Sequence, residues 1–136
     1  MLKTIPAFPV HEIEKAVDFY QAKFGFLCRH KEIGFAILIR DTVENHLWVS
    51  NDRSWKWRRL LIFCGPIISG AESFLAGTHS CRIEVDQIDE LFSEYSGKGV
   101  FHYTTNKVEE TEWETKEFHV VDLHGNLITF YQNIEE

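Results

Sequence analysis

The chain contains an internal repeat, and this repeat restricts the possible folds more than any other feature of the sequence. Residues 10–20 can be laid over residues 85–95, so that Val10 meets Val85 and Tyr20 meets Tyr95. In both copies a short apolar stretch leads into an acidic turn, and an amphipathic segment then ends near a glycine. Stacked copies of a repeated unit bury a continuous core that one copy cannot form alone. The chain is therefore expected to fold as two similar modules.

Each copy is predicted to contain one helix. Over residues 12–24, apolar side chains recur with the 3.6-residue period of a helix. Glu12 and Glu14 suit the positive end of the helix dipole, and Gly25 suits the C-terminal stop. The second helix is expected over residues 88–96, with glycines following it.

Short stretches rich in aromatic and β-branched residues, separated by turn residues, are predicted to be strands. They are 4–9, 27–31, 35–40 and 45–50 in the first half, and 79–85, 100–104, 117–122 and 126–132 in the second. Together with the helices they give the order βαβββ twice. We therefore predict an α+β fold of two tandem βαβββ modules that form curved mixed sheets.

The length of 136 residues supports a single domain. We expect module one over residues 1–50, a connector over 51–78 and module two over 79–136. The connector is long for a compact domain, so part of it is expected to pack as an additional element.

The charge balance argues against nucleic acid as a partner. Fourteen Lys and Arg stand against 21 Asp and Glu, which gives a net charge of −7, whereas phosphate binding needs a surplus of cations. A basic cluster beside Trp55 and Trp57 is interpreted as a local counter-patch; its members are Arg53, Lys56, Arg58 and Arg59. An acidic protein is compatible with a cationic small molecule as its partner.

The cysteines and the apolar segments point to the cytoplasm. Cys28, Cys64 and Cys81 are an odd number without metal-type spacing, so neither a disulfide framework nor a structural zinc site is expected. No signal-like segment precedes the first strand, and the most apolar run, 60–69, is too short to cross a bilayer. We expect a cytoplasmic protein without a membrane partner.

Five short motifs, in order, carry a family resemblance. They are Pro6-x-Phe8-Pro9; Ala16-Val17-x-Phe19-Tyr20-x-x-x-Phe24-Gly25-Phe26; Phe35-Ala36-x-x-x-Arg40-Asp41; Ser80-Cys81-Arg82-Ile83-x-Val85-Asp86; and Glu112-Trp113 followed by Phe118-x-x-x-Asp122-x-x-Gly125-Asn126. With the tandem βαβββ order, they resemble the glyoxalase, bleomycin resistance and extradiol dioxygenase (vicinal oxygen chelate) superfamily, and within it the bleomycin resistance branch. The resemblance covers nearly the whole chain except the connector.

In that superfamily, enzymes hold a divalent metal with His and Glu residues. The resemblance places Ile5, Ser80 and Thr129 at three of these positions and the fourth near Trp48, and none of these side chains is a usual ligand. We therefore expect no metal, no other cofactor and no catalytic residue. Four histidines keep a metal open as an alternative: His46, His79, His119 and His124.

The same resemblance implies a ligand site. Phe35 and Trp113 match residues that stack on a planar antibiotic, and Ser50 is a polar contact by position. Glu112 and Glu114 belong to five carboxylates around Trp113, with Glu109, Glu110 and Glu117, that would attract a cationic ligand. Two alternatives stay open here: Phe35 as a core residue, and the carboxylates as a solvated loop.

The expected function is non-catalytic sequestration of a planar cationic antibiotic of the bleomycin type, in a groove between the two chains of a homodimer. The N-terminal strand, bracketed by Pro6 and Pro9, can exchange between chains in the proteins that this one resembles. The alternatives are a metal-dependent lyase or dioxygenase acting on a small oxygenated substrate, and a metal-free protein that binds another planar ligand.

Overall fold

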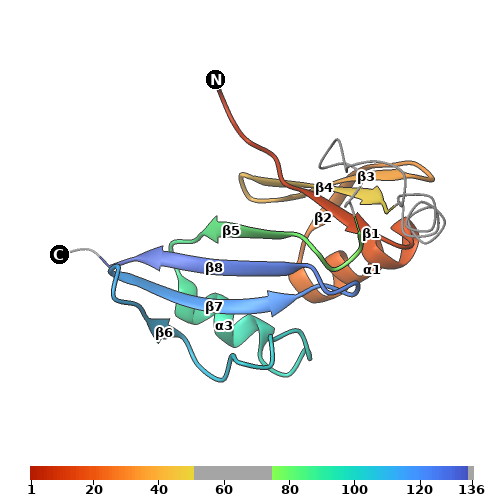
Figure 1. Cartoon of the computed structure of the whole chain (residues 1–136). Coiled ribbons are helices and arrows are strands. Elements are labelled where there is room, and N and C mark those ends of the chain that lie inside the picture. The colour runs from red at the N-terminus through yellow and green to blue at the C-terminus, as the bar shows by residue number, and fades with distance from the viewer. Residues whose placement is uncertain (51–74, 135–136) are drawn as a thin grey trace, which may run out of the picture.

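In the computed structural model, which describes residues 1–50 and 75–134, each half of the chain forms one four-stranded sheet (Figure 1). The first half contains β1 (Ala7–Val10), α1 (Ile13–Phe24), β2 (Leu27–Lys31), β3 (Phe35–Arg40) and β4 (Val43–Val49). The second half contains β5 (Ser80–Glu84), α3 (Ile88–Tyr95), β6 (Glu109–Glu110), β7 (Thr115–Val121) and β8 (Leu127–Asn133). The predicted α+β fold of two βαβββ modules is confirmed.

Both sheets have the same topology. The strand orders are β1-β4-β3-β2 and β5-β8-β7-β6, and in each sheet the first strand runs parallel to the last strand of its module. The other neighbours are antiparallel, so both sheets are mixed. Pro9 lies inside β1, which is tolerated because β1 is an edge strand.

The helices cover one face of each sheet. The buried side of α1 consists of the apolar residues that the 3.6-residue period indicated: Ile13, Ala16, Val17, Tyr20 and Phe24. At the end of α1, Gly25 has φ +72°, and a Cβ there would lie 2.9 Å from Nη1 of Arg40. Glycine adopts this left-handed conformation without strain and also leaves room for the arginine.

One predicted strand is wrong. Residues 100–104 form no strand; Phe101 makes only an isolated bridge to Val120. Val100 is fully buried and the Phe101 ring stacks on Phe92 at 4.6 Å, so the apolar pattern reflects packing against α3. The edge of the second sheet is β6 instead, whose two residues pair with β7.

Reciprocal contacts join the two modules at the ends of their helices. The Lys23 ammonium donates to the backbone carbonyl of Lys98 (3.0 Å), and the Lys98 ammonium donates to the carbonyl of Lys23 (3.3 Å). Arg40 donates to the carbonyl of Phe24 and forms an ion pair with Glu94 of α3 (2.8 Å). These contacts relate the two repeats by an approximate two-fold symmetry.

The Asp-x-x-Gly-Asn motif makes the second junction. Asp122 is buried and accepts hydrogen bonds from the Tyr20 hydroxyl (3.0 Å), the Asn126 amide side chain (2.9 Å) and the backbone N–H groups of His124 and Asn126 (both 2.9 Å). Asn126 also donates to the carbonyl of Pro9 in β1 (2.8 Å). The turn between β7 and β8 is thereby tied to both α1 and β1.

The connector contains most of what the structure leaves undescribed. The expected additional element, the basic cluster beside Trp55 and Trp57, and Cys64 lie outside the described residues. Neither described helix is long and apolar enough to cross a membrane.

Candidate functional site

Phe35 begins β3 on the face of the first sheet that points away from α1. The next residues alternate, with Ala36 and Leu38 buried in the core, so Phe35 lies on the opposite face. Its ring is 4.5 Å from the half-exposed Trp48 and 5.0 Å from His46, measured between centroids. Phe35 is half-buried and does not belong to the core cluster formed by the described residues, which favours a surface phenylalanine over a core one. It forms part of an aromatic surface.

Trp113 lies in the tight loop between β6 and β7. The loop is closed by the N–H of Thr111, which donates to the carbonyl of Thr115 (2.8 Å), and by a hydrogen bond between their hydroxyls (2.8 Å). Glu114 adopts φ +60°, and its carbonyl accepts from the N–H of Ile134 (2.9 Å). The Trp113 side chain is 64% exposed. A constrained loop therefore presents a largely exposed indole.

Glu117 is buried on the open face of the second sheet. Its carboxylate accepts two hydrogen bonds from the Arg82 guanidinium (2.6 and 3.2 Å), one from the Thr115 hydroxyl (2.6 Å) and one from the Trp113 indole N–H (2.9 Å). Burial raises the pKa of this carboxyl, but the bonds from Arg82, Thr115 and Trp113 outweigh burial and lower the pKa to about 2. Glu117 is therefore ionised and already neutralised by Arg82.

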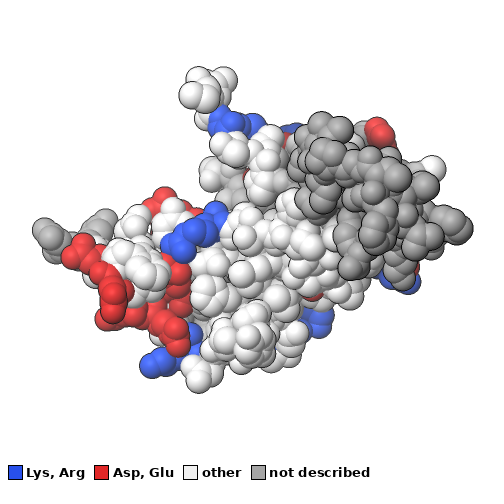
Figure 2. Space-filling model, viewed as in Figure 1, with Lys and Arg blue, Asp and Glu red and all other residues white. Residues whose placement is uncertain are grey.

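The five carboxylates around Trp113 are not equivalent. Glu109, Glu110, Glu112 and Glu114 are exposed, whereas Glu117 is held by Arg82. The interpretation of Glu117 as a partner for a cationic ligand needs correction for that reason. Figure 2 shows acidic side chains gathered at the end of the molecule where β8 ends and β7 begins. The remaining four carboxylates give the surroundings of Trp113 a negative charge.

Ser50 follows β4 at the corner next to α1. Its N–H donates to the carbonyl of Val10 (2.8 Å), and its hydroxyl lies 3.5 Å from Nδ1 of His11. The side chain is half-buried. Ser50 is thus near the Phe35 end of the first sheet, but in the described structure it contacts β1 and its following turn.

The predicted residues fall into two groups within one chain. Phe35 opens β3, and Glu112, Trp113 and Glu114 precede β7; Figure 1 shows that these two strands begin at opposite ends of the molecule. No ring contact joins Phe35 to Trp113 among the described residues, and the two groups lie on different sheets. One chain does not bring its two predicted stacking residues together.

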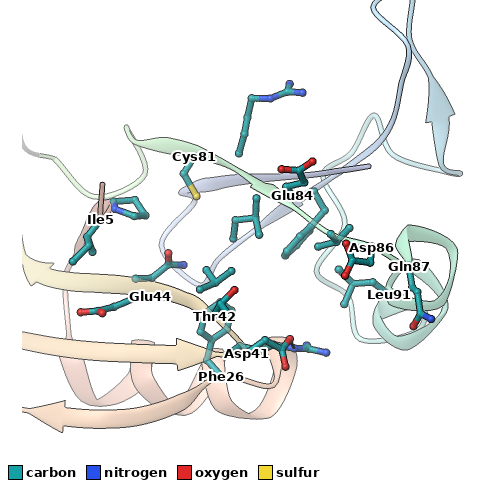
Figure 3. A pocket seen from close by; sticks show the side chains of 18 of the residues that line it. Ile5, Phe26, Asp41, Thr42, Glu44, Cys81, Glu84, Asp86, Gln87 and Leu91 are labelled. Carbon is teal, nitrogen blue, oxygen red and sulfur yellow. Dashed lines mark ion pairs between the residues drawn. The ribbon is translucent and has the colours of Figure 1, made fainter. Parts of the chain in front are cut away.

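A groove of about 1370 Å³ separates the two modules (Figure 3). Ile5, Asp41 and Glu44 line one side, and Cys81 and Glu84 of β5 lie on the other. It exceeds the roughly 300–1000 Å³ of pockets that enclose drug-sized ligands. Six carboxylates and three cations are in its lining: Asp41, Glu44, Glu84, Asp86, Glu90 and Glu94 against Lys3, Arg40 and Arg82. The groove is acidic, but its lining includes none of the predicted site residues.

Two side chains that line the groove are the amide of Asn45 and the thiol of Cys81. The Asn45 side chain is fully buried, and neither its amide nitrogen nor its oxygen has a hydrogen-bond partner within the part of the chain that is described. Burial raises the pKa of the Cys81 thiol to about 12, so the reactive thiolate is scarcely populated at neutral pH. The Asn45 amide is therefore not accessible to a ligand in the groove, and Cys81 supplies no nucleophile there.

The expected ligand positions form no metal centre among residues 1–50 and 75–134, where no group of three or more His, Cys, Asp or Glu side chains is arranged to hold an ion. His46 contacts Glu44 (2.8 Å), His79 contacts the Thr78 hydroxyl (3.0 Å) and His119 contacts the Thr129 hydroxyl (2.9 Å). These three histidines each have a hydrogen-bond partner, whereas the buried Nδ1 of His124 has none among the described residues.

The strand register corrects the fourth metal-ligand position, which the sequence placed near Trp48. Phe8 of β1 pairs with Leu47, and Ile83 of β5 pairs with Phe130, so Leu47 corresponds to Phe130 in the repeat. His46 rather than Trp48 therefore corresponds to Thr129. A slip of two residues arose because the aromatic stretch at the end of β4 gives no landmark for the register.

Two residues beside the predicted site, Trp48 and Arg82, were not predicted from the sequence to belong to it, and Glu117 was predicted with a different role. Trp48 extends the aromatic surface of Phe35, and Arg82 and Glu117 connect β5 to Trp113. Trp48 could have been found by alternation, since it is two residues from His46 on the same face of β4. The pairing of Arg82 with Glu117 joins residues 35 positions apart, and no local pattern indicates it.

Comparisons with known proteins agree with this architecture. The chain is 44% identical over 135 residues to a bleomycin resistance protein of Geobacillus stearothermophilus and to one of Staphylococcus aureus, and in each case 99% of both chains is covered. No family model matches the chain.

Among solved structures, a bleomycin-binding protein complexed with bleomycin is 19% identical, with a TM-score of 0.70 and coverage of 98% of this chain and 99% of the other. A glyoxalase/bleomycin resistance protein/dioxygenase from Nocardioides has a TM-score of 0.66 at 19% identity, covering 97% of this chain and 83% of the other. At such identities these structures establish a shared fold.

Proposed function

Because the chain belongs to the bleomycin resistance protein family, we propose that it binds bleomycin and sequesters it without any chemical step, which protects the cell from the drug. The observation that carries this proposal is the 44% identity over 99% of both chains to proteins of that name. The exposed indole of Trp113, the aromatic surface at Phe35 and the carboxylates around Trp113 suit a planar cationic ligand.

Sequestration is governed by mass action. The protein protects the cell only if its dissociation constant lies below the free drug concentration and enough protein is present. A submicromolar constant corresponds to about −8 kcal/mol or better. Two aromatic stacks contribute only about 0.5–1.5 kcal/mol each beyond burial, so the drug must also be enclosed. Enclosure of the drug must therefore supply most of the binding free energy.

Isothermal titration with metal-free bleomycin tests the function. We expect a submicromolar dissociation constant, no dependence on EDTA, and recovery of chemically unchanged drug after hours of incubation. An effect of EDTA would indicate a metal-dependent enzyme. Mass spectrometry of the recovered drug would detect any covalent modification. Absence of heat and of tryptophan quenching at millimolar bleomycin would contradict the proposal.

The enclosing groove is assigned to a homodimer. Phe35 opens β3 and Trp113 precedes β7, and these two strands begin at opposite ends of the molecule, which supports a ligand site shared between two chains (Figure 1). We propose that Phe35 and Ser50 of one chain face Trp113, Glu112 and Glu114 of its partner. Sedimentation at micromolar concentration is expected to show twice the 16.0 kDa chain mass. A monomer would argue against a composite groove.

Within each chain, the two modules are proposed to act as one domain over residues 1–136. The hydrogen bonds from Tyr20 to Asp122 and from Asn126 to Pro9 support this, because they cross from one module to the other in buried positions. The proposed place of action is the cytoplasm, where reduced thiols such as those of Cys28 and Cys81 persist.

A further inference from the structure

The geometry points to Glu117 as a positioning residue that holds the Trp113 indole in the orientation that stacks on the ligand. This inference rests on the proposed function, since it assigns a role within the same binding site. Trp113 is 64% exposed, yet its N–H donates to Glu117 Oε1 at 2.9 Å. An exposed tryptophan without such a bond would sample several rotamers.

Glu117 itself has little capacity left for a ligand. Its Oε1 accepts from Arg82 (2.6 Å), Thr115 (2.6 Å) and Trp113 (2.9 Å), and its Oε2 accepts from Arg82 (3.2 Å). A carboxylate offers about four acceptor positions in all. The residue is only 4% exposed, so a bound drug would meet the indole and not the carboxylate. Glu117 therefore acts through Trp113.

The anchor is itself fixed from two directions. The Arg82 side chain extends from β5 over the Tyr131 ring, with its guanidinium carbon 4.7 Å from the ring centroid, and pairs with Glu117 in β7. The Thr115 hydroxyl donates to the Glu117 carboxylate. Thr115 also closes the Trp113 loop through its hydrogen bonds to Thr111. The backbone and the indole N–H of Trp113 are thus both attached to the same sheet.

The consequence is a preformed stacking surface. Ordering a free side chain on binding weakens affinity, and an indole ordered beforehand avoids that loss. The penalty for immobilising one such side chain corresponds to a change of about 2- to 10-fold in the dissociation constant. Loss of the Glu117 anchor should therefore weaken bleomycin binding by this factor.

NMR of the ligand-free protein tests the anchor directly. The indole N–H resonance of Trp113 is identified by its absence in Trp113→Phe. In the wild-type protein we expect this resonance to lie downfield, with restricted picosecond–nanosecond motion in spite of ring exposure. In Glu117→Gln it should shift upfield and become more mobile. An unrestricted indole in the wild-type protein would overturn the inference, and this arm needs no replacement of Glu117.

A double-mutant cycle tests the route to the ligand. Trp113→Phe keeps an aromatic ring but removes the N–H, so we expect Glu117→Gln and Trp113→Phe each to weaken bleomycin binding about 2- to 10-fold. Combined, they should weaken it no more than either alone, because both break the same hydrogen bond. If Glu117→Gln weakened bleomycin binding by the same factor in the wild-type protein and in Trp113→Phe, the inference would be overturned.

Glu14→Gln is the matched control. It also removes one carboxylate and one ion pair, to Lys31 at 2.6 Å, but it lies on α1 away from Trp113. We expect its affinity for bleomycin and its Trp113 resonance to match those of the wild type. If the wild-type protein binds no bleomycin, the proposed function fails, whereas the NMR arm still decides whether Glu117 anchors the indole.

Discussion

Replacing Asp122 with alanine is expected to lower the free energy of unfolding by about 3–5 kcal/mol, a large fraction of the stability of a small domain. The substitution removes one buried carboxylate that accepts four hydrogen bonds, from the Tyr20 hydroxyl, the Asn126 side chain and the backbone of His124 and Asn126. All these donors would lose their acceptor together, and the Tyr20 hydroxyl is buried within the core.

Urea denaturation followed by circular dichroism measures this loss. Asp18→Ala removes a carboxylate from the exposed side of α1 and is expected to change stability by no more than about 0.5 kcal/mol. Tyr20→Phe removes a single donor to Asp122 and should cost about 1 kcal/mol. If Asp122→Ala were as stable as Asp18→Ala, the network would not join the two modules as described.

Removing either stacking ring is expected to weaken bleomycin binding about 30-fold or more, the loss typical of an interface residue worth 2 kcal/mol. Phe35→Ala removes a ring that is packed on Trp48 at 4.5 Å, and Trp113→Ala removes the exposed indole. Calorimetric titration of each variant measures the loss. Tyr103→Ala is the matched control, because it deletes a 92% exposed ring whose described ring contact is with His102, and not with Phe35 or Trp113, and it should leave affinity unchanged.

Mixing the two variants distinguishes a composite groove from a site within one chain. A dimer of one Phe35→Ala chain and one Trp113→Ala chain contains one groove with both rings and one with neither. After random exchange of subunits, about a quarter of the grooves should regain wild-type affinity. No recovery after demonstrated exchange would contradict the pairing of Phe35 with Trp113 across the dimer.

The elements near the site were largely predictable from local patterns. The bounds of β2 and β3 agree with the predicted strands, and α1 differs by one residue at its start, because alternation and the 3.6-residue period report which side chains are buried. A strand was wrongly predicted at residues 100–104 for the same reason. Burial of Val100 against α3 produces the same apolar pattern as a strand.

The sequence by itself determined the repeat, the fold class and the ends of the helices, because these depend on neighbours within a few residues. Tertiary structure decided which polar groups are available. Tyr20 bonds to Asp122, 102 positions away, and this pair joins the two modules. Arg82 bonds to Glu117, 35 positions away, and this pair anchors Trp113. Glu112 and Glu117 are the same residue type near the same tryptophan, yet only burial and a distant arginine distinguish the solvated carboxylate from the neutralised one.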